Sequence, residues 1–528
     1  MAWRTIRRFT RRSPRRCVSL TVGSAAVATS LLMVPPLEYV PAPLLPSRVL
    51  LDGVGRVFRC AYVSGCIFVD YAWSLHGVED QERWNEVHLR SASRLVKLAE
   101  TNGGLYVKVG QVFANLNHVL PPQYCSVMAV LQDNVAKRPF TEVMAVLEHD
   151  LDRPVDEIFE VIDPKPLAAA SLAQVHRGKL RKEGIDVAVK VQYIDIAQRF
   201  KGDMRTIQLM LNIAGFFFRG YDLSGIVSKL NKTVGNELDF ALEADNCERG
   251  ARDLKAGGFG DRVVTPEVLR LYSTRRVLTT RLIKDAARIT DISRLMELGI
   301  EPKMVASWLY DALSYQLFVS GFVHGDPHAG NILVHRLPNG KPQVVLLDFG
   351  LCTELTDEMR RDLATIWTSS VTHDTATLKR ISEKFGIEDY ALLASCFLQH
   401  PYELFTAEGR VMTKMTKGLM QDQMRNQMDK INEIVYELPK EYSLVLRNIM
   451  AAKAINKVLN DPVNRPLRML RYSARICNEG RSQWYVLLLM LRAWWSELIS
   501  SIQLAYARWR YPELLTALDD SLQLQLSG

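Results

Sequence analysis

The stretch Val323–Leu351 reads VHGDPHAGNILVHRLPNGKPQVVLLDFGL. It contains two apolar runs, ILVH and QVVLLD, on either side of Leu-Pro-Asn-Gly, and this pattern predicts a β-hairpin. Asn331 stands where the hairpin begins and Asp348 where it ends. Because the strands of a hairpin run antiparallel, we expect both polar side chains at the same end of it.

Oxygen atoms gathered in this way suit a magnesium ion, which is held by one or two carboxylates together with substrate phosphates. Asp326 precedes Asn331 by five residues, and Asp348 opens an Asp-Phe-Gly triplet. Protein-kinase-like phosphotransferases place their catalytic acid and their metal ligands in this order. We therefore expect Asp326 to orient the nucleophile, and Asn331 and Asp348 to hold Mg²⁺. The alternative interpretation is an ordinary surface hairpin, which would require His324, Asp326, Asn331 and Asp348 to occur together by chance.

A lysine upstream fits the same chemistry. Val187–Gln192 alternates apolar and polar residues, as a strand with one buried face does, and Lys190 lies on the polar face. From there it can reach the α- and β-phosphates of a nucleotide, although a lone strand lysine is usually only solvated. The segment Asn236–Asn246 offers three acidic partners, of which the last two share a helix face: Glu237, Asp239 and Glu243.

Two features of an ordinary protein kinase are missing from the sequence. No Gly-x-Gly-x-x-Gly precedes Lys190, and an alanine-rich loop stands there instead: Ala168, Ala169, Ala170 and Ser171. Alanine resists the positive φ angles that glycine accepts, so this loop must meet the phosphates differently. Only a few residues separate Asp348 from the next predicted helix, which begins near Thr356. That leaves no room for a segment that holds an extended peptide.

The order of elements predicts an α+β fold with two lobes, as in kinases. A further hairpin is expected from Val264–Leu271 and Arg276–Leu282. We divide the chain into a targeting sequence with a possible membrane segment, a helical extension, a small lobe, a large lobe and a C-terminal helical region: 1–50, 51–165, 166–285, 286–395 and 396–528.

Charge and cysteines bear on the compartment. Seven of the eight net positive charges come from arginines in residues 1–16, which contain no acid, as in a mitochondrial transit peptide. The rest of the chain is nearly neutral, so no nucleic-acid partner is expected. Cys17–Val34 is an uncharged run at the short limit for a membrane span. The eight cysteines have no disulfide or zinc spacing. Trp484–Leu491 is apolar but too short to span, and suits either core packing or an interfacial anchor.

Several motifs together carry a family resemblance: LYVKVGQ (105–111), LQD (131–133), PLAAASLAQVH (166–176), VAVKVQ (187–192), ELDFALEADN (237–246), FVHGDPHAGNIL (322–333) and LLDFG (346–350). In this order they resemble the UbiB/aarF family of atypical kinases, across roughly residues 85–355. Flanking segments such as LRNIMAAKAINKVL resemble the aarF-domain-containing kinase 5 branch of that family. Arg281 stands where the family often has an acidic residue.

The resemblance implies that the N-terminal helical extension packs on the nucleotide cleft. It also implies a motif over the place where a peptide would bind: Lys108, Gly110 and Gln111. Glu237 and Asp239 would belong to this arrangement, which leaves Glu243 as the partner of Lys190. The alanine-rich loop is associated in the family with altered nucleotide selectivity. Better-studied members bind ATP with Mg²⁺, hydrolyse it, and support coenzyme Q biosynthesis at the inner mitochondrial membrane.

These observations lead to one functional expectation and two alternatives. We expect a mitochondrial, membrane-associated protein that binds ATP or ADP with Mg²⁺ and acts as an ATPase or a phosphotransferase on a small molecule. That molecule would be lipid-linked or quinone-related, in coenzyme Q or mitochondrial lipid metabolism. One alternative is a Ser/Thr protein kinase. The other is a nucleotide-sensing pseudokinase that acts through partners.

Overall fold

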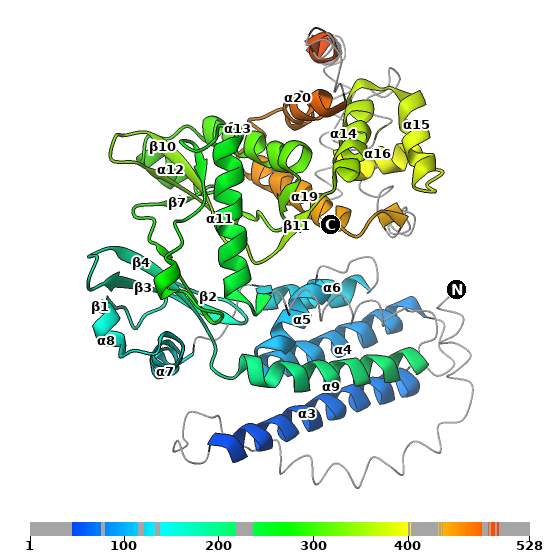
Figure 1. The fold of residues 1–528 in the computed structure, drawn as a ribbon. Helices are drawn as coiled ribbons and strands as arrows, with labels where there is room; N and C mark the ends of the chain where they lie inside the picture. Colours follow the sequence, from blue (N-terminus) through cyan, green and yellow to red (C-terminus); the bar gives the residue numbers. More distant parts are fainter. Residues whose placement is uncertain are drawn as a thin grey trace. The chain divides into compact units, whose positions relative to one another are not determined.

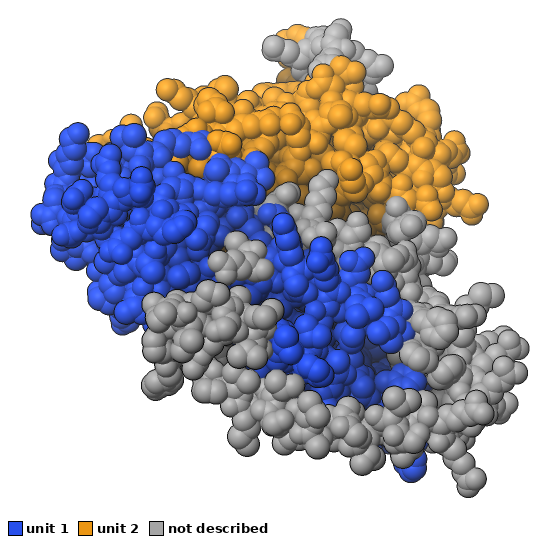
Figure 2. All heavy atoms as spheres, turned by 60° about the horizontal axis from the view of Figure 1, so that its bottom comes forward, with its two compact units in different colours: residues 1–242, 269–282 blue, residues 243–268, 283–528 orange. Residues whose placement is uncertain are grey.

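The computed structural model describes residues 45–74, 80–114, 121–132, 138–217, 235, 237–399, 402, 431, 434, 435, 437–477, 484, 487–491, 494 and 495. The chain forms two compact units, shown in different colours in Figure 2. Unit 1 comprises Met1–Leu242 and Leu269–Leu282, and unit 2 comprises Glu243–Val268 and Ile283–Gly528. Residues 1–44, which include the arginine-rich segment and Cys17–Val34, lie outside the described residues. In the described ranges, no helix is both long and apolar enough to cross a membrane.

One part of unit 1 is helical and combines helices of the predicted extension, 51–165, with one later helix. Its elements are α3 (Leu45–Ser74), α4 (Gln81–Asn102), α5 (Leu105–Ala114), α6 (Pro122–Met128), a 3₁₀ turn (Ala129–Gln132) and α9 (Ile196–Phe217). Helices α3, α4 and α9 lie side by side (Figure 1). The side chain of Asp80 accepts a hydrogen bond from the amide of Glu82 and so caps α4. Gly103 ends that helix at a φ of +63°, which glycine tolerates and most residues do not.

The other part of unit 1 is an antiparallel sheet with strand order β1-β3-β4-β6, and β2 pairs with β3. The strands are β1 (Phe159–Ile162), β2 (Ala168–Ala169), β3 (Ala173–Leu180), β4 (Asp186–Gln192) and β6 (Val277–Arg281). Helices α7 (Phe140–Leu151) and α8 (Val155–Ile158) pack on the face of β4 that carries its buried valines: Val187, Val189 and Val191. The predicted alternation of β4 is confirmed.

The prediction of a hairpin from Val264–Leu271 and Arg276–Leu282 was wrong. Strand β5 (Val263–Val264) pairs in parallel with β10 (Pro342–Leu346), whereas β6 pairs with β4. Between them lies a 3₁₀ turn, Arg270–Tyr272. The second run predicted strand β6 correctly, whereas the first contains only Val264 of β5 and the start of the 3₁₀ turn. The period of a run says nothing about which strand it will join.

Unit 2 holds two small sheets and many helices. One sheet has strand order β5-β10-β9-β7, and the other pairs β11 with β8. The strands not yet located are β7 (Ala287–Arg288), β8 (Phe322–His324), β9 (Ile332–Arg336) and β11 (Cys352–Glu354). The helices are α11 (Phe240–Ala256, whose first turn belongs to unit 1), α12 (Ile292–Glu297), α13 (Pro302–Ser314), a π-helical segment (Tyr315–Ser320), a 3₁₀ turn (Ala329–Asn331), α14 (Asp357–Thr372), α15 (Thr375–Lys384), α16 (Tyr390–Leu398), α19 (Tyr442–Val458) and α20 (Arg465–Cys477).

A single large hydrophobic core stabilises unit 2. It includes fully buried side chains from the sheets and from α13, α14 and α19, such as Val344, Leu309, Trp367 and Ile449. The catalytic stretch predicted from the sequence runs from β8 to β11 across this core. The mixed helix-and-strand character of the predicted fold is confirmed. The five-part division of the chain and the packing of the extension on a cleft stay predictions.

Candidate active site

His324 holds the predicted catalytic loop in place. It is fully buried at the end of β8. The amide N–H of Asp326 donates to His324 Nδ1 over 3.1 Å, so Nε2 carries the proton and donates to the carbonyl of Leu347 over 2.9 Å. Burial lowers the pKa of His324, which favours the neutral imidazole that this pair of bonds requires. His324 therefore connects the catalytic loop to the segment before Asp348.

The hairpin brings the two predicted metal ligands to one end, as expected. Strands β9 and β10 pair antiparallel, with Ile332 opposite Leu346, and the amide of Leu347 donates to the carbonyl of Asn331 over 2.8 Å. Asn331, which precedes β9, accepts this bond, and Asp348 is the next residue after its donor, Leu347, which follows β10. The structure thus places them as neighbours, while their role as metal ligands stays a prediction.

The atoms available at this end of the hairpin fit a hard cation. Asn331 donates its amide nitrogen to the carbonyl of Asp326 over 3.2 Å, and so its amide oxygen is left for another partner. Asp348 Oδ1 accepts a hydrogen bond from the amide of Gly350 over 3.3 Å. Asp348 has a φ of +57°, a left-handed conformation in which Asp and Asn are among the favoured non-glycine residues. A carboxylate and an amide oxygen are donors that Mg²⁺ accepts.

Helix α11 supports the Asp348-Phe349-Gly350 turn from within unit 2. The ring of Phe349 is buried and packs edge-on against His324, with 4.7 Å between the ring centroids. Asn246 donates its side-chain N–H to the carbonyl of Phe349 over 3.0 Å. Gly250 faces the same ring, and a Cβ at this position would lie 2.6 Å from Phe349 Cε1. The absence of a side chain at Gly250 therefore makes room for Phe349.

Glu243 lies beside the same turn. Its side chain is buried, and a Cβ built on Gly350 would lie 3.2 Å from Asp348 Oδ1 and 3.6 Å from Glu243 Oε2. The two carboxylates therefore flank one glycine. A cation at this point would reduce their mutual repulsion, which agrees with the metal site predicted there.

A Gly250→Ala variant is expected to displace Phe349 and to lower the thermal stability and any nucleotide-dependent activity of unit 2. The added methyl group cannot keep its 2.6 Å approach to a buried ring, and overpacking of this kind costs about 1–3 kcal/mol. Gly202→Ala on α9 is the matched control, because nothing lies within 4 Å of its Cβ position. A thermal melt with no difference between the two variants would show that Phe349 moves at no cost.

Lys190 lies on β4 in unit 1, half-buried on the face opposite the valines. Its ammonium nitrogen is 4.9 Å from the centroid of the Phe240 ring. Glu243 belongs to unit 2. The predicted Lys190–Glu243 pair therefore joins residues of different units, and it stays a prediction.

The alanine-rich loop begins as a strand rather than as a phosphate-binding turn. Ala168 and Ala169 form β2 and pair with Val175 and Gln174 of β3. None of the three alanines has a positive φ among the described residues, in agreement with the conformational limit expected for alanine. The hydroxyl of Tyr193 donates to the carbonyl of Ala170 over 2.9 Å, and burial raises the pKa of Tyr193 to about 12. Ser171 is buried next to this bond.

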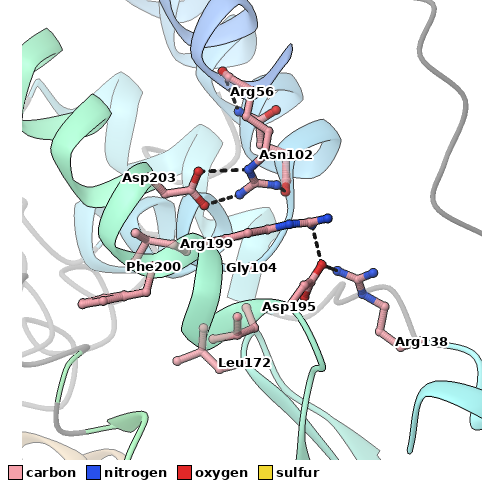
Figure 3. Close-up of a pocket in the computed structure, with 11 residues that line it drawn as sticks. Arg56, Asn102, Gly104, Arg138, Leu172, Asp195, Arg199, Phe200 and Asp203 are labelled. Carbon is pink, nitrogen blue, oxygen red and sulfur yellow. Dashed lines mark hydrogen bonds and ion pairs between the residues drawn. The ribbon is translucent and has the colours of Figure 1, made fainter. Parts of the chain in front are cut away.

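A cluster of arginines and aspartates in unit 1 lines a cavity together with Leu172 (Figure 3). It consists of Arg56, Arg138, Asp195, Arg199 and Asp203, and we call it the Arg–Asp cluster. Asp195 pairs with both Arg138 and Arg199, and Asp203 pairs with Arg56. The cluster lines a cavity of about 10 Å³, space for no more than about one water molecule. Leu172, which directly follows the alanine-rich loop, lines the same cavity.

The Lys-x-Gly-Gln motif is fixed by contacts inside unit 1. Lys108 Nζ lies 2.6 Å from Glu237 Oε2, so these two predicted residues form an ion pair. Gln111 donates to the carbonyl of Leu131 over 2.9 Å, and a Cβ on Gly110 would overlap Leu131 Cδ1. The motif therefore packs closely against the segment that contains Leu131. Whether it covers a substrate position stays a prediction.

Asp239 has a different role from Glu237. Its carboxylate accepts hydrogen bonds from the amides of Ala241 and Leu242 and pairs with Arg275, whose Nε is 3.1 Å away. These contacts cap the first turn of α11 and satisfy amides that have no partner inside the helix. The resemblance groups Asp239 with Lys108, and that grouping stays a prediction.

Two residues of α19 contact the predicted catalytic loop although no motif in the sequence points to them. Arg447 Nη2 is 2.8 Å from Asp326 Oδ2. Asn448 is fully buried and donates its amide nitrogen to the carbonyl of His324 over 2.7 Å. Both residues follow the predicted catalytic loop by more than 100 positions. No spacing rule or local motif connects positions this far apart.

Comparisons with known proteins point in one direction. Residues 130–382 match the family model described as the ABC1 atypical kinase-like domain. The chain is 34% identical over 442 residues to "Probable serine/threonine-protein kinase abkD" of Dictyostelium discoideum, covering 82% of this chain and 63% of that protein. It thus spans less than two thirds of that relative's length. It is 31% identical to "AarF domain-containing kinase 1" of Drosophila melanogaster, covering 73% of this chain and 74% of that protein.

One solved structure is also similar, that of Rv3197 with erythromycin from Mycobacterium tuberculosis. The sequence identity is 22% and the TM-score 0.42, over 71% of this chain and 97% of that chain. This similarity is too low to support a conclusion.

Proposed function

This chain belongs to the ABC1/AarF family of atypical kinase-like proteins, and from that premise we propose that it binds Mg-ATP and transfers the γ-phosphoryl group to water or to a small molecule. The observation that carries the proposal is the set of hydrogen bonds that connects the predicted catalytic loop to the end of the β9–β10 hairpin. There His324 and Asn331 each form hydrogen bonds both to Asp326 and to Leu347, the residue that precedes Asp348. The resemblance to the kinase 5 branch stays a prediction.

Each residue has a defined part in this proposal. Asn331 and Asp348 hold Mg²⁺, which when bound neutralises charge on the phosphates. Asp326 orients the hydroxyl group or water that attacks, a task that needs a positioned carboxylate more than a strong base. Lys190 pairs with the α- and β-phosphates, and Glu243 orients Lys190. Positioning by these groups supplies the main rate effect in phosphoryl transfer.

The chain after Asp348 favours a small acceptor over a peptide. Strand β11 begins at Cys352, and the hydroxyl of Thr356 caps α14 by accepting from the amide of Met359 over 3.2 Å. Regular secondary structure thus begins again at Cys352, four residues after Asp348. An extended peptide needs a longer segment to bind along. The printed name of the Dictyostelium relative is the observation that keeps a Ser/Thr protein kinase as the second candidate.

We place this activity in mitochondria, at the inner membrane, in coenzyme Q or mitochondrial lipid metabolism. The arginine-rich composition of residues 1–16 supports the compartment, and the family resemblance supports the pathway. Lipid and quinone profiles of cells that carry Asp348→Asn in place of the native residue test this. Profiles that match those of wild-type cells, in cells where the variant is expressed at normal level, would rule out the metabolic part of the proposal.

The catalytic part is tested by an Asp326→Asn variant. We expect its affinity for Mg-ATP to stay within about twofold of wild type, while kcat for ATP hydrolysis falls by about 10²–10⁴-fold, the range for loss of a positioned acid–base group. Nucleotide binding is measured by calorimetry and hydrolysis by phosphate release.

Three other results would change the interpretation. An unaltered kcat would remove Asp326 from the catalytic machinery. Phosphate transfer to protein that is lost in Asp326→Asn would favour the Ser/Thr kinase. Full rescue of a deletion phenotype by Asp326→Asn would favour a nucleotide-sensing pseudokinase, because this variant keeps nucleotide binding.

A further inference from the structure

Helix α19 is held against both the catalytic loop and helix α13. Asn448 is fully buried and bonds the carbonyl of His324, as described above. Leu444 packs close to Gly325, where an added Cβ would lie 3.3 Å from Leu444 Cδ1. One turn further along the helix, the hydroxyl of Tyr310 on α13 donates to the carbonyl of Ala452 over 2.8 Å. A side chain on α19 is therefore held at a defined distance from Asp326.

Arg447 uses this position to contact the predicted catalytic acid. One nitrogen, Nη2, is 2.8 Å from Asp326 Oδ2. A guanidinium group has five N–H donors, and no other partner of Arg447 lies in the part of the chain that the structure describes. A carboxylate can accept more than one hydrogen bond, so Asp326 Oδ1 stays available for a substrate hydroxyl or water.

The Arg447–Asp326 ion pair contributes little to the stability of the fold. The side chains of Arg447 and Asp326 are 47% and 26% exposed, and ion pairs of this kind contribute about 0–1 kcal/mol. Another ion pair in unit 2 shows the contrast. Arg468 of α20 donates to both oxygens of Asp311, over 2.9 and 2.6 Å, and these side chains are less exposed. That two-pronged arrangement ties α20 to α13, whereas Arg447 holds only one oxygen of one carboxylate.

We propose that Arg447 is a positioning residue for phosphoryl transfer, which fixes the Asp326 carboxylate so that Oδ1 meets the attacking group. The inference rests on the proposed function. In the step itself, the acceptor O–H gives its proton to Asp326 and its oxygen forms the new bond to the γ-phosphorus. The bond from that phosphorus to the bridging oxygen breaks, and ADP leaves with the bond electrons. Arg447 touches none of the reacting atoms and acts through Asp326.

The test compares Arg447→Met and Arg447→Lys with wild type in the full-length chain. For Arg447→Met we expect kcat for ATP hydrolysis to fall by about 10–100-fold, as for a misplaced catalytic group, while KM for ATP stays within about twofold. Arg447→Lys should recover part of kcat, because its ammonium group can still pair with Asp326. In the double variant Asp326→Asn/Arg447→Met, kcat should be no lower than in Asp326→Asn alone.

Arg294→Met is the matched control, since Arg294 forms an exposed ion pair with Glu297 on α12. It should leave kcat and KM unchanged. All variants should melt within a few degrees of wild type, so that lost activity is not lost folding.

Each alternative result decides against the inference. An unaltered kcat in Arg447→Met would overturn it, and a raised kcat would do so by showing that Arg447 restrains Asp326. A change in KM alone would assign Arg447 to nucleotide binding. Additive losses in the double variant would separate Arg447 from Asp326. A wild-type chain that binds Mg-ATP without hydrolysing it fails at the proposed function itself, a result distinguishable from all of these.

Discussion

An Asp348→Asn variant is expected to weaken Mg-dependent nucleotide binding by about 100-fold or more. Loss of residues that merely support a metal ligand costs about 10–100-fold in metal affinity, so loss of the only carboxylate among the predicted ligands should cost at least as much. Asparagine tolerates the left-handed backbone at this position, where φ is +57°, and so the turn should survive. Calorimetric titration of ATP with and without Mg²⁺ measures the effect.

The matched control for this variant is Asp152→Asn. Asp152 is exposed at the end of α7 and also has a left-handed backbone, with a φ of +51°. The same chemical change there should leave nucleotide affinity unaltered. If Asp348→Asn binds Mg-ATP as tightly as wild type does, the metal site has been assigned to the wrong residues, whatever the fold.

An Asp203→Asn variant is expected to destabilise unit 1 by about 3–5 kcal/mol. The side chains of Arg56 and Asp203 are only 4% and 8% exposed, and the substitution removes the carboxylate to which Arg56 donates, so that among carboxylates only the weaker interaction with Asp52 still favours the buried charge. The arginine keeps two weaker contacts, one to the carbonyl of Asn102 and one to the Tyr106 ring at 5.3 Å. The urea midpoint measures the loss, and hydrogen exchange of α3 and α9 locates it.

The control for this prediction is Glu160→Gln, which breaks an exposed pair with Lys179 in the same unit. That change should cost less than about 1 kcal/mol. Arg56→Met combined with Asp203→Leu should recover much of the stability, because an uncharged pair carries no desolvation penalty. Equal losses for Asp203→Asn and Glu160→Gln would mean that water reaches the Arg–Asp cluster.

The same experiment bears on the alanine-rich loop. Leu172 follows that loop and packs in one hydrophobic core with Leu105 of α5 and Ile196 of α9. Leu172 and the Arg–Asp cluster line the same cavity (Figure 3). Disturbance of Asp203 should therefore reach Ala170 through Leu172, and exchange of the Ala170 amide, which donates to the carbonyl of Ala173, should rise with that of α9.

Local patterns predicted those parts of the site that a few neighbouring residues specify. The β9–β10 hairpin followed from two apolar runs and a turn, and the face of Lys190 followed from a period of two. The cap of α14 at Thr356 followed from a hydroxyl before two acids. In each case the determining interactions lie within a few residues or one strand pair.

Long-range pairing was beyond these patterns. The partner of β5 is β10, about 80 residues away, and the hairpin predicted for β5 was wrong for this reason. The Arg–Asp cluster gathers Arg56, Arg138 and Asp203 from three separate segments, each of which alone suggests only a solvated charge. Arg447 and Asn448 likewise contact residues that are more than 100 positions away in the sequence.

The sequence by itself determined which chemistry we propose for this chain: Lys190, Asp326, Asn331 and Asp348 stand out because kinase-like phosphoryl transfer uses these groups in this order. Only the tertiary structure decided how they are held. His324 reaches Leu347, α11 leaves space for Phe349, and Arg447 meets Asp326, because packing of a shared core brings together residues that no local rule connects. Chemical identity is a property of single residues, whereas orientation depends on every element packed around them.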